Sequence, residues 1–230
     1  MKRGWLVREE GLVPYGAAYE SMHELAERRA QNAIPDTLIL LEHPPVFTAG
    51  RRSDPTHILW AENQIEAAGA ELHFVDRGGS VTFHGPGQLV GYPIVDLGVA
   101  PDVVGYLREL EEVIIRAAGE IGIGLERDPE ATGVWAGKRK VCAIGVRVTR
   151  GRVTLHGFAL NCTTDLSWFD AIVPCGLADR SVTTLSELAR RDVTVGEMAP
   201  IVAHHFESVF GMTLEPAPQG VSVSSLTLVR

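Results

Sequence analysis

The chain has 230 residues, 45% of them hydrophobic, which is enough for one sizeable core, and no stretch of its composition marks a linker between domains. Its 21 Lys and Arg residues against 29 Asp and Glu residues give a net charge of −8, which argues against nucleic acid as a partner. There is no run of about eighteen apolar residues and we expect no signal peptide, so the sequence predicts a cytoplasmic protein with no membrane contact. The three cysteines lack C-x-x-C spacing, which predicts free thiols.

Apolar periodicity predicts strands and helices along the whole chain. Strands are expected over residues 5–7, 36–41, 71–76, 88–97, 140–149 and 153–161, and helices over 14–26 and 102–121. A helical turn is expected over 165–171, and capping boxes at Thr184/Glu187 and Thr194/Glu197 predict two further helices, the last ending at Gly211. Residues 1–214 then form a single compact domain, followed by a loosely packed tail over 215–230.

A glycine-rich stretch over residues 77–92, R-G-G-S-V-T-F-H-G-P-G-Q-L-V-G-Y, interrupts this pattern. Glycine within strand-forming sequence marks places where something approaches the backbone closely. Few polar groups interrupt it, which suits a groove with a main-chain floor and with Arg77 and His84 at its rim. The alternative is a pair of tight turns in which His84 is a structural histidine.

Lys140 is the second notable feature, because lysine is rare in this chain. Only Lys2, Lys138 and Lys140 are lysines, so arginine carries most of the positive charge. Strand alternation places Lys140 at the start of an otherwise apolar row, where partial desolvation favours its neutral form. A lysine, unlike an arginine, can then accept and return a proton.

Cys175 follows an apolar run and sits between Pro174 and Gly176. Such a thiol suits covalent acyl transfer, with the amide after it free to face an oxyanion and Lys140 as its base. Cys142 instead reads as a small buried hydrophobe. Two alternatives remain open: Cys175 is an inert buried thiol, or His156, Cys162 and Cys175 bind a metal, although their spacing matches no common zinc pattern.

The sequence closely resembles the lipoyl(octanoyl) transferases of the biotin and lipoate protein ligase superfamily in four motifs. These are the stretch over 77–92, R-K-V-C-A-I-G-V-R-V, H-G-F-A-L-N and I-V-P-C-G. The resemblance extends over residues 14–210. It implies an α/β fold of the α+β type, with a larger mixed sheet flanked by helices and a smaller sheet. It also implies transfer of an octanoyl group from octanoyl-acyl carrier protein to a lysine of lipoyl domains, through a thioester on Cys175.

Matched residue by residue, the resemblance gives Cys175 as the nucleophile and Lys140 as the lysine that activates it. Phe83 departs from the tyrosine or tryptophan of many relatives. The residues expected to contact substrate are Arg77, Gly78, Gly79, Ser80, Val81, Thr82, Phe83, His84, Ala143, Ile144, Gly145, Gly157, Phe158 and Ala159.

The resemblance further implies no cofactor and no metal, and a monomer whose acceptors are the lipoyl domains of 2-oxoacid dehydrogenase E2 subunits and the glycine cleavage H protein. A thioester donor is already activated, and no G-K-[ST] follows the glycine-rich stretch, so ATP is not expected. An ATP-dependent lipoate protein ligase of the same fold and a non-catalytic domain that binds acyl chains or carrier protein are the alternatives. Because acyl carrier proteins are acidic, a local basic surface is expected among Arg51, Arg52, Arg147, Arg150 and Arg152, with Arg150 and Arg152 as the pair to reverse.

Overall fold

The computed structural model describes residues 2–173 and 180–223 of the chain. Its strands are β1 Lys2–Leu12, β2 Asp36–Glu42, β3 Val46–Ala49, β4 Glu71–Phe74, β5 Val81–His84, β6 Gln88–Ile94, β7 Glu126–Arg127, β8 Val134–Ala136, β9 Arg139–Thr149, β10 Val153–Asn161, β11 Ser181–Val182 and β12 Met212–Pro216. Its α-helices are α1 Tyr15–Ala30, α2 Glu62–Ala67, α3 Val103–Glu120, α4 Leu185–Ala189 and α5 Val195–Phe210, with 3-10 turns at Pro55–His57 and Leu166–Ala171.

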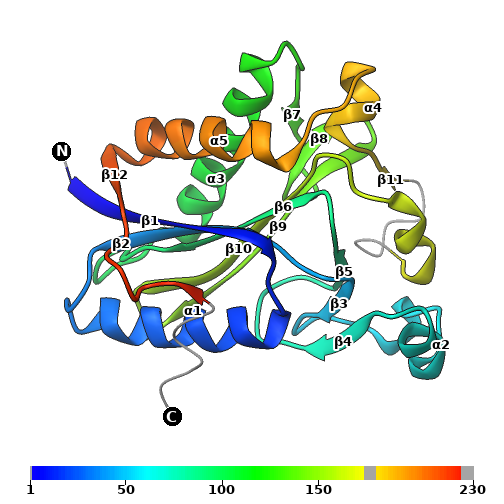
Figure 1. Ribbon diagram of the computed structural model, residues 1–230, viewed down its shortest axis with the longest axis horizontal. Coiled ribbons are helices and arrows are strands. Elements are labelled where there is room, and N and C mark those ends of the chain that lie inside the picture. The colour runs from blue at the N-terminus through cyan, green and yellow to red at the C-terminus, as the bar shows by residue number, and fades with distance from the viewer. Residues whose placement is uncertain (1, 174–179, 224–230) are drawn as a thin grey trace.

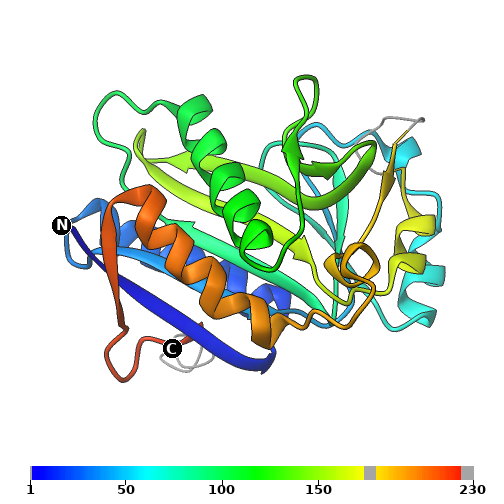
Figure 2. The ribbon, with the colours of Figure 1, turned by 90° about the horizontal axis from the view of Figure 1, so that it is seen from above.

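Two mixed sheets organise the fold, as expected. The larger has the order β12-β1-β2-β6-β10-β9-β8-β7, with β11 also paired to β9, and the smaller has the order β4-β3-β5. Helix α1 covers one face of the larger sheet, and α3 and α5 cover the other (Figures 1 and 2). The smaller sheet lies at one end with α2 beside it, so a junction between the two sheets is available for a site.

Local sequence explains where the helices begin and end. Thr184 and Thr194 accept hydrogen bonds from the amides of Glu187 and Glu197, so both predicted N-caps are confirmed. Helix α5 ends at Gly211, whose φ of 61° lies in the left-handed region that glycine adopts without strain. These ends fix α5 against α3 over the larger sheet.

Two regions differ from the predicted elements. Strand β1 extends well beyond residues 5–7, because its polar ends pair with β2 and β12 although they lack an alternating apolar pattern. The expected loosely packed tail does not begin at Glu215: β12 runs through Pro216, and Val223 is 1% exposed. There the Ser21 hydroxyl donates to the carbonyl of Val223 at 3.2 Å, which holds the segment on α1.

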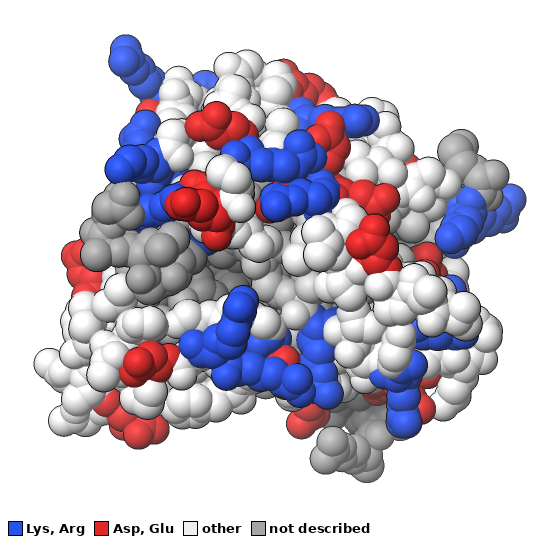
Figure 3. Space-filling view, turned by 180° about the vertical axis from the view of Figure 1, so that it is seen from behind, with Lys and Arg blue, Asp and Glu red and all other residues white. Residues whose placement is uncertain are grey.

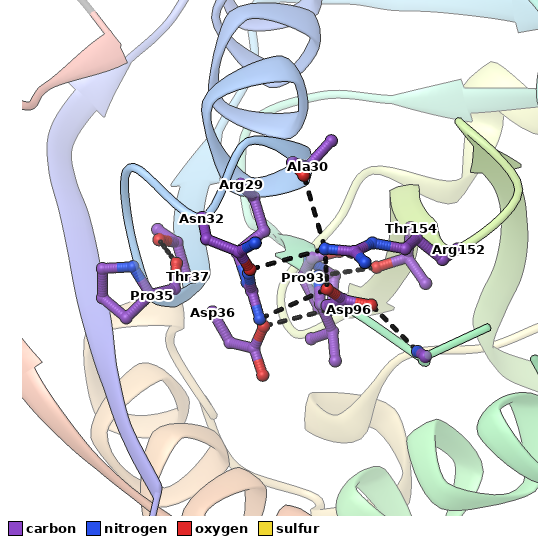
Figure 4. A network of polar contacts seen from close by, with 12 residues as sticks. Arg29, Ala30, Asn32, Pro35, Asp36, Thr37, Pro93, Asp96, Arg152 and Thr154 are labelled. Atoms are coloured by element: carbon purple, nitrogen blue, oxygen red, sulfur yellow. Dashed lines mark hydrogen bonds and ion pairs between the residues drawn. The ribbon is translucent and has the colours of Figure 1, made fainter.

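A network of charged side chains closes the end of the larger sheet farther from the smaller one (Figure 4). Arg29, at the end of α1, contacts Asp36 at 2.7 Å and Asp96 at 3.5 Å, and Arg152 contacts Asp96 at 2.8 Å. The Asp36 carboxylate also accepts the Asp96 amide at 3.0 Å. The network thereby joins α1 to the start of β2, the end of β6 and the start of β10.

Candidate active site

A cavity of about 100 Å³ lies where the smaller sheet meets β9 and β10. The glycine-rich stretch, the middle of β9 and the middle of β10 all contribute to its wall. Of the residues predicted to contact substrate, Arg77, Gly78, Gly79, Ser80, Val81, Thr82, His84, Ala143, Ile144, Gly145, Gly157, Phe158 and Ala159 line it, and Lys140 does too. Segments about eighty residues apart in the sequence thus surround one space.

Phe83 does not line this cavity. It is fully buried in the smaller lobe, stacked on Trp168 with ring centroids 5.2 Å apart. A Cβ at Gly85 would come within 2.5 Å of the Phe83 ring, so the glycine is needed for this packing. The aromatic residue at position 83 therefore supports the wall of the cavity from behind.

The Arg77 side chain is buried in the wall, although the sequence predicted it at the rim. Its Nη2 donates to the carbonyl of Thr48 at 2.6 Å and to the Thr48 hydroxyl at 3.0 Å. The neighbouring backbone is also fixed, because the Gly78 amide donates to the carbonyl of Val146 on β9 at 3.0 Å. Arg77 thereby ties the smaller sheet to the larger one and brings a positive charge to the cavity.

His84 belongs to a chain of hydrogen bonds along the same wall. The Thr48 hydroxyl lies 3.3 Å from its Nε2, and its Nδ1 lies 2.8 Å from Oε1 of Gln88, so Nδ1 is the donor of the neutral ring. The Gln88 amide donates onward to Asn161 at 2.9 Å. Burial, with the nearby His43 next, lowers the pKa of His84 to about 3. With both ring nitrogens engaged and no positive charge, His84 shapes the wall and is a poor general base.

Lys140 is the second residue of β9 and is 7% exposed. Its Nζ lies 4.5 Å from the centre of the Trp135 ring on the neighbouring β8, a cation–π distance. The Trp135 indole N–H donates to the carbonyl of Ala131 at 3.1 Å, and the Arg180 guanidinium carbon lies 5.0 Å from the ring centre. The sequence prediction of a desolvated lysine agrees with this burial, and Trp135 fixes where the ammonium lies.

The backbone beside Lys140 leaves little space. Gly133 has a φ of 129°, and a Cβ there would meet the carbonyl of Cys142 at 2.6 Å and Cε of Lys140 at 3.3 Å. The Gly133 amide donates to Glu111 at 3.0 Å, and this carboxylate is fully buried on α3. Glu111 therefore holds the loop against which the Lys140 side chain packs.

Phe158 gives the cavity an apolar surface through an aromatic–glycine pair. It faces Gly91 across β10 and β6, and a Cβ at Gly91 would fall 2.1 Å from its ring. A Cβ at Gly157 would likewise fall 2.2 Å from the carbonyl of Gly91. Gly91, which was predicted to mark close approach, thus leaves room for the Phe158 ring, and Gly157 leaves room for the backbone of β6.

His156 also lines the cavity, in an unusual backbone conformation for a strand. Its φ is 59°, a region sparsely used by residues with a Cβ, and its Nε2 lies 2.7 Å from Asp76. Burial, with the charge of Arg77 next, lowers the pKa of His156 to about 3. A neutral His156 thus donates to Asp76 and fixes the segment that leads into Arg77.

The cysteines separate into two groups. Cys142 and Cys162 are fully buried in the core, and burial raises the pKa of both thiols, that of Cys162 to about 12. Cys175, the predicted nucleophile, lies outside the described residues. The part of the chain that is described holds no group of three or more His, Cys, Asp or Glu side chains placed to bind a metal.

The residues flanking this segment lie close to the cavity. The Val173 amide donates to the carbonyl of His57 at 2.8 Å. On the other side, Val182 lines the cavity and pairs in register with Lys140. The described chain therefore resumes beside the predicted lysine.

Several lining residues were not predicted to contact substrate. Gln88 and Asn161 belong to two of the quoted motifs, where a polar residue beside a buried strand was an available signal. Tyr15 comes from a segment predicted only as a helix, and Phe169 comes from one predicted only as a helical turn. The additional lining residues are Tyr15, Gln88, Tyr92, His156, Asn161, Phe169 and Val182.

Comparison with known proteins gives a consistent result at the sequence level. Residues 14–207 match the model of the lipoyl protein ligase A/B catalytic domain. A protein of Rubrobacter xylanophilus named octanoyltransferase is 48% identical over 205 residues, covering 89% of this chain and 92% of that protein. One of Gloeobacter violaceus with the same name is 49% identical, covering 92% of each chain.

Solved structures share the fold at much lower identity. A lipoate-protein ligase A bound with ATP has a TM-score of 0.77 and 16% identity, covering 98% of this chain and 92% of that one. A putative lipoate protein ligase from T. acidophilum has a TM-score of 0.73 and 15% identity, covering 98% and 91%. Among the described residues, no helix has the length and apolar character needed to cross a membrane.

Proposed function

Because the chain belongs to the lipoyl protein ligase A/B catalytic domain family and is an acyltransferase, we propose that it transfers an octanoyl group from octanoyl-acyl carrier protein to a lysine amine of lipoyl domains. The observation that carries this proposal is the position of Lys140 in the wall of a cavity lined by residues of the three matched segments expected to contact substrate. The acceptors are the lipoyl domains of 2-oxoacid dehydrogenase E2 subunits and the glycine cleavage H protein. Cytoplasmic location and the monomeric state stay predictions.

In the first step, the Cys175 thiolate attacks the thioester carbonyl of the donor. A new thioester forms on Cys175, the bond to the carrier thiol breaks, and the thiol proton taken by Lys140 passes to the departing carrier sulfur. Val182, the strand partner of Lys140, follows Cys175 closely in the sequence, and this supports the pairing. Apolar Ile144 and Phe158 suit the acyl chain.

In the second step, the acceptor lysine amine attacks the thioester on Cys175. An amide forms, the Cys175 sulfur leaves, and the proton lost by the amine returns to the dyad of Cys175 and Lys140. A thioester is already an activated acyl donor, so neither step requires ATP.

The distinguishing experiment is incubation of the protein with octanoyl-acyl carrier protein without ATP, followed by intact mass measurement. We expect one octanoyl group on the protein, released when a lipoyl domain is added. Cys175→Ser should abolish this acylation, whereas Cys142→Ser and Cys162→Ser should largely keep it, since both of those thiols are buried in the core.

Other outcomes identify the alternatives. Octanoylation of the lipoyl domain only with free octanoate and ATP would indicate a lipoate ligase activity. Binding of the carrier protein with no acyl transfer would indicate a non-catalytic domain. Equal loss in the three cysteine variants would contradict the thioester on Cys175.

A further inference from the structure

The arginines expected to form a basic surface are not equivalent in the structure. Arg147, Arg150 and Arg152 are held by carboxylates of the chain itself, so a partner would have to compete for them. Arg51 and Arg52 are exposed, and neither has an ion-pair partner within residues 2–173 and 180–223. The internal pairs are Arg147 with Asp76, Arg150 with Glu27 at 2.8 Å and Arg152 with Asp96 at 2.8 Å.

The turn that carries Arg51 and Arg52 is bonded to the cavity wall. The Arg51 amide donates to the carbonyl of Arg77 at 3.1 Å, and the Arg52 amide donates to the carbonyl of Gly79 at 3.2 Å. Both acceptor residues line the cavity. Figure 3 shows a group of Lys and Arg side chains below a hollow on one face of the molecule, and a second group, mixed with Asp and Glu, above it. Cations on this turn therefore lie next to the wall that receives the substrate.

An exposed aromatic residue lies on the neighbouring strand. Phe74, at the end of β4, is 78% exposed and pairs in register with Ala49, the residue just before the turn. The Val75 amide donates to the carbonyl of Ala49 at 2.8 Å, so the end of β4 is fixed to the start of the turn. Arginine and large aromatic side chains are enriched at protein interfaces, whereas an isolated monomer gains nothing by exposing this ring.

We propose that Arg51, Arg52 and Phe74 form the docking surface for the acidic carrier protein that delivers the octanoyl thioester. This inference rests on the proposed function. A chain of net charge −8 repels an acidic protein at long range, so productive encounter needs local cations that are not neutralised internally. A donor attached to a carrier protein also needs a docking point close to the cavity, and this turn is hydrogen-bonded to its wall.

The test is steady-state kinetics of Arg51→Glu/Arg52→Glu with octanoyl-acyl carrier protein and a lipoyl domain. At low salt the KM for the carrier protein should rise about tenfold with kcat unchanged, and the difference should shrink as salt is added. The variant should use octanoyl-pantetheine, which carries the thioester without the protein, as efficiently as the wild type does. The KM for the lipoyl domain should not change.

Two further variants serve as controls. Lys2→Glu/Arg8→Glu makes the same change in net charge at exposed positions of β1 and should leave the KM for the carrier protein near that of the wild type. Arg51→Lys/Arg52→Lys keeps the charge and should also stay near the wild type. Phe74→Ser should raise the same KM by an amount that depends little on salt.

Three results would overturn the docking surface. The first is an unchanged KM for the carrier protein at low salt. The second is a rise in the KM for the lipoyl domain instead, which would make the turn an acceptor site. The third is equal loss with octanoyl-pantetheine, which would give the turn a role in shaping the cavity. A wild-type protein that takes octanoate from neither thioester would contradict the proposed function itself.

Discussion

Charged side chains are arranged differently at the two ends of strands β2, β6 and β10. At the end shown in Figure 4, the carboxylates of Asp36 and Asp96 are matched by the guanidinium groups of Arg29 and Arg152. At the cavity end, the cations Arg77 and Lys140 contribute to the wall, and the described residues that line the cavity include no Asp or Glu.

This difference agrees with the proposed function of the cavity end. Matched charges at the first end hold four elements together and leave little net field. A cavity with cations, neutral histidines and no acidic lining favours groups that become negative, such as a thiolate or the oxyanion formed when it attacks a thioester. The contrast predicts that changes at the cavity end impair chemistry, whereas changes at the network end impair stability.

The largest expected effect comes from Lys140→Arg. If Lys140 supplied only positive charge, arginine would keep much of the activity, since a guanidinium also lies well over the Trp135 ring. Arginine cannot give up its proton, so loss of general acid and base catalysis should lower single-turnover acylation at least about a hundredfold. The measurement is acylation across pH, with Lys138→Arg expected near the wild type. Normal rates in Lys140→Arg would mean that Lys140 contributes only its positive charge.

Asp96→Asn should have the next largest effect, on stability. The change keeps the shape of the side chain but removes the carboxylate shared by Arg29 and Arg152, whose side chains are partly buried. Leaving these cations partly uncompensated should lower the free energy of unfolding by about 2 kcal/mol, measured by denaturant titration. Acylation by octanoyl-pantetheine below the unfolding transition should be retained.

A matched control for Asp96→Asn lies on α1. Glu24 forms an exposed i,i+4 pair with Arg28 at 3.8 Å, so Glu24→Gln should change the free energy of unfolding by less than about 0.5 kcal/mol. If Asp96→Asn is as mild as this control, the network does not stabilise the fold. If it lowers acylation without lowering stability, the two ends of the sheet are not separate in the way that the comparison implies.

Sequence patterns predicted the fold where periodicity and local signals agree. The helix over 102–121, the strands on each side of Gly151 and the two threonine caps follow from residues close together in the chain. Strands β7, β8 and β11 were missed because each has two or three residues and exists only through its pairing with a neighbour. The same holds for β12, which forms against β1 from the far end of the chain.

The site residues show the same distinction between local signals and contacts that depend on distant parts of the chain. The glycine-rich stretch and Lys140 carry local signals, so their presence at one cavity could be predicted. The Trp135 ring under Lys140 could not, because the contact depends on the register of β8 against β9, which has an irregularity between residues 134 and 135. Nor could the sequence separate Arg51 and Arg52 from the arginines that pair internally, since their partners come from distant elements.

The last expected effect appears only on acidification and concerns the buried histidines near the cavity. His43 is fully buried, with Nδ1 2.6 Å from the carbonyl of Val13 and Nε2 2.7 Å from the Tyr92 hydroxyl. Burial lowers its pKa to about 4, whereas the unfolded chain takes up the proton near 6.5. Between these values the unfolded state binds more protons, so the free energy of unfolding falls as pH drops from about 6.5 towards 4, by up to about 1.4 kcal/mol per pH unit. His43→Gln should reduce this slope in denaturant titrations at pH 7, 6 and 5, with the exposed His204→Gln as control. A wild-type slope in His43→Gln would mean that acid sensitivity originates elsewhere, with His84 and His156 as the next groups to replace.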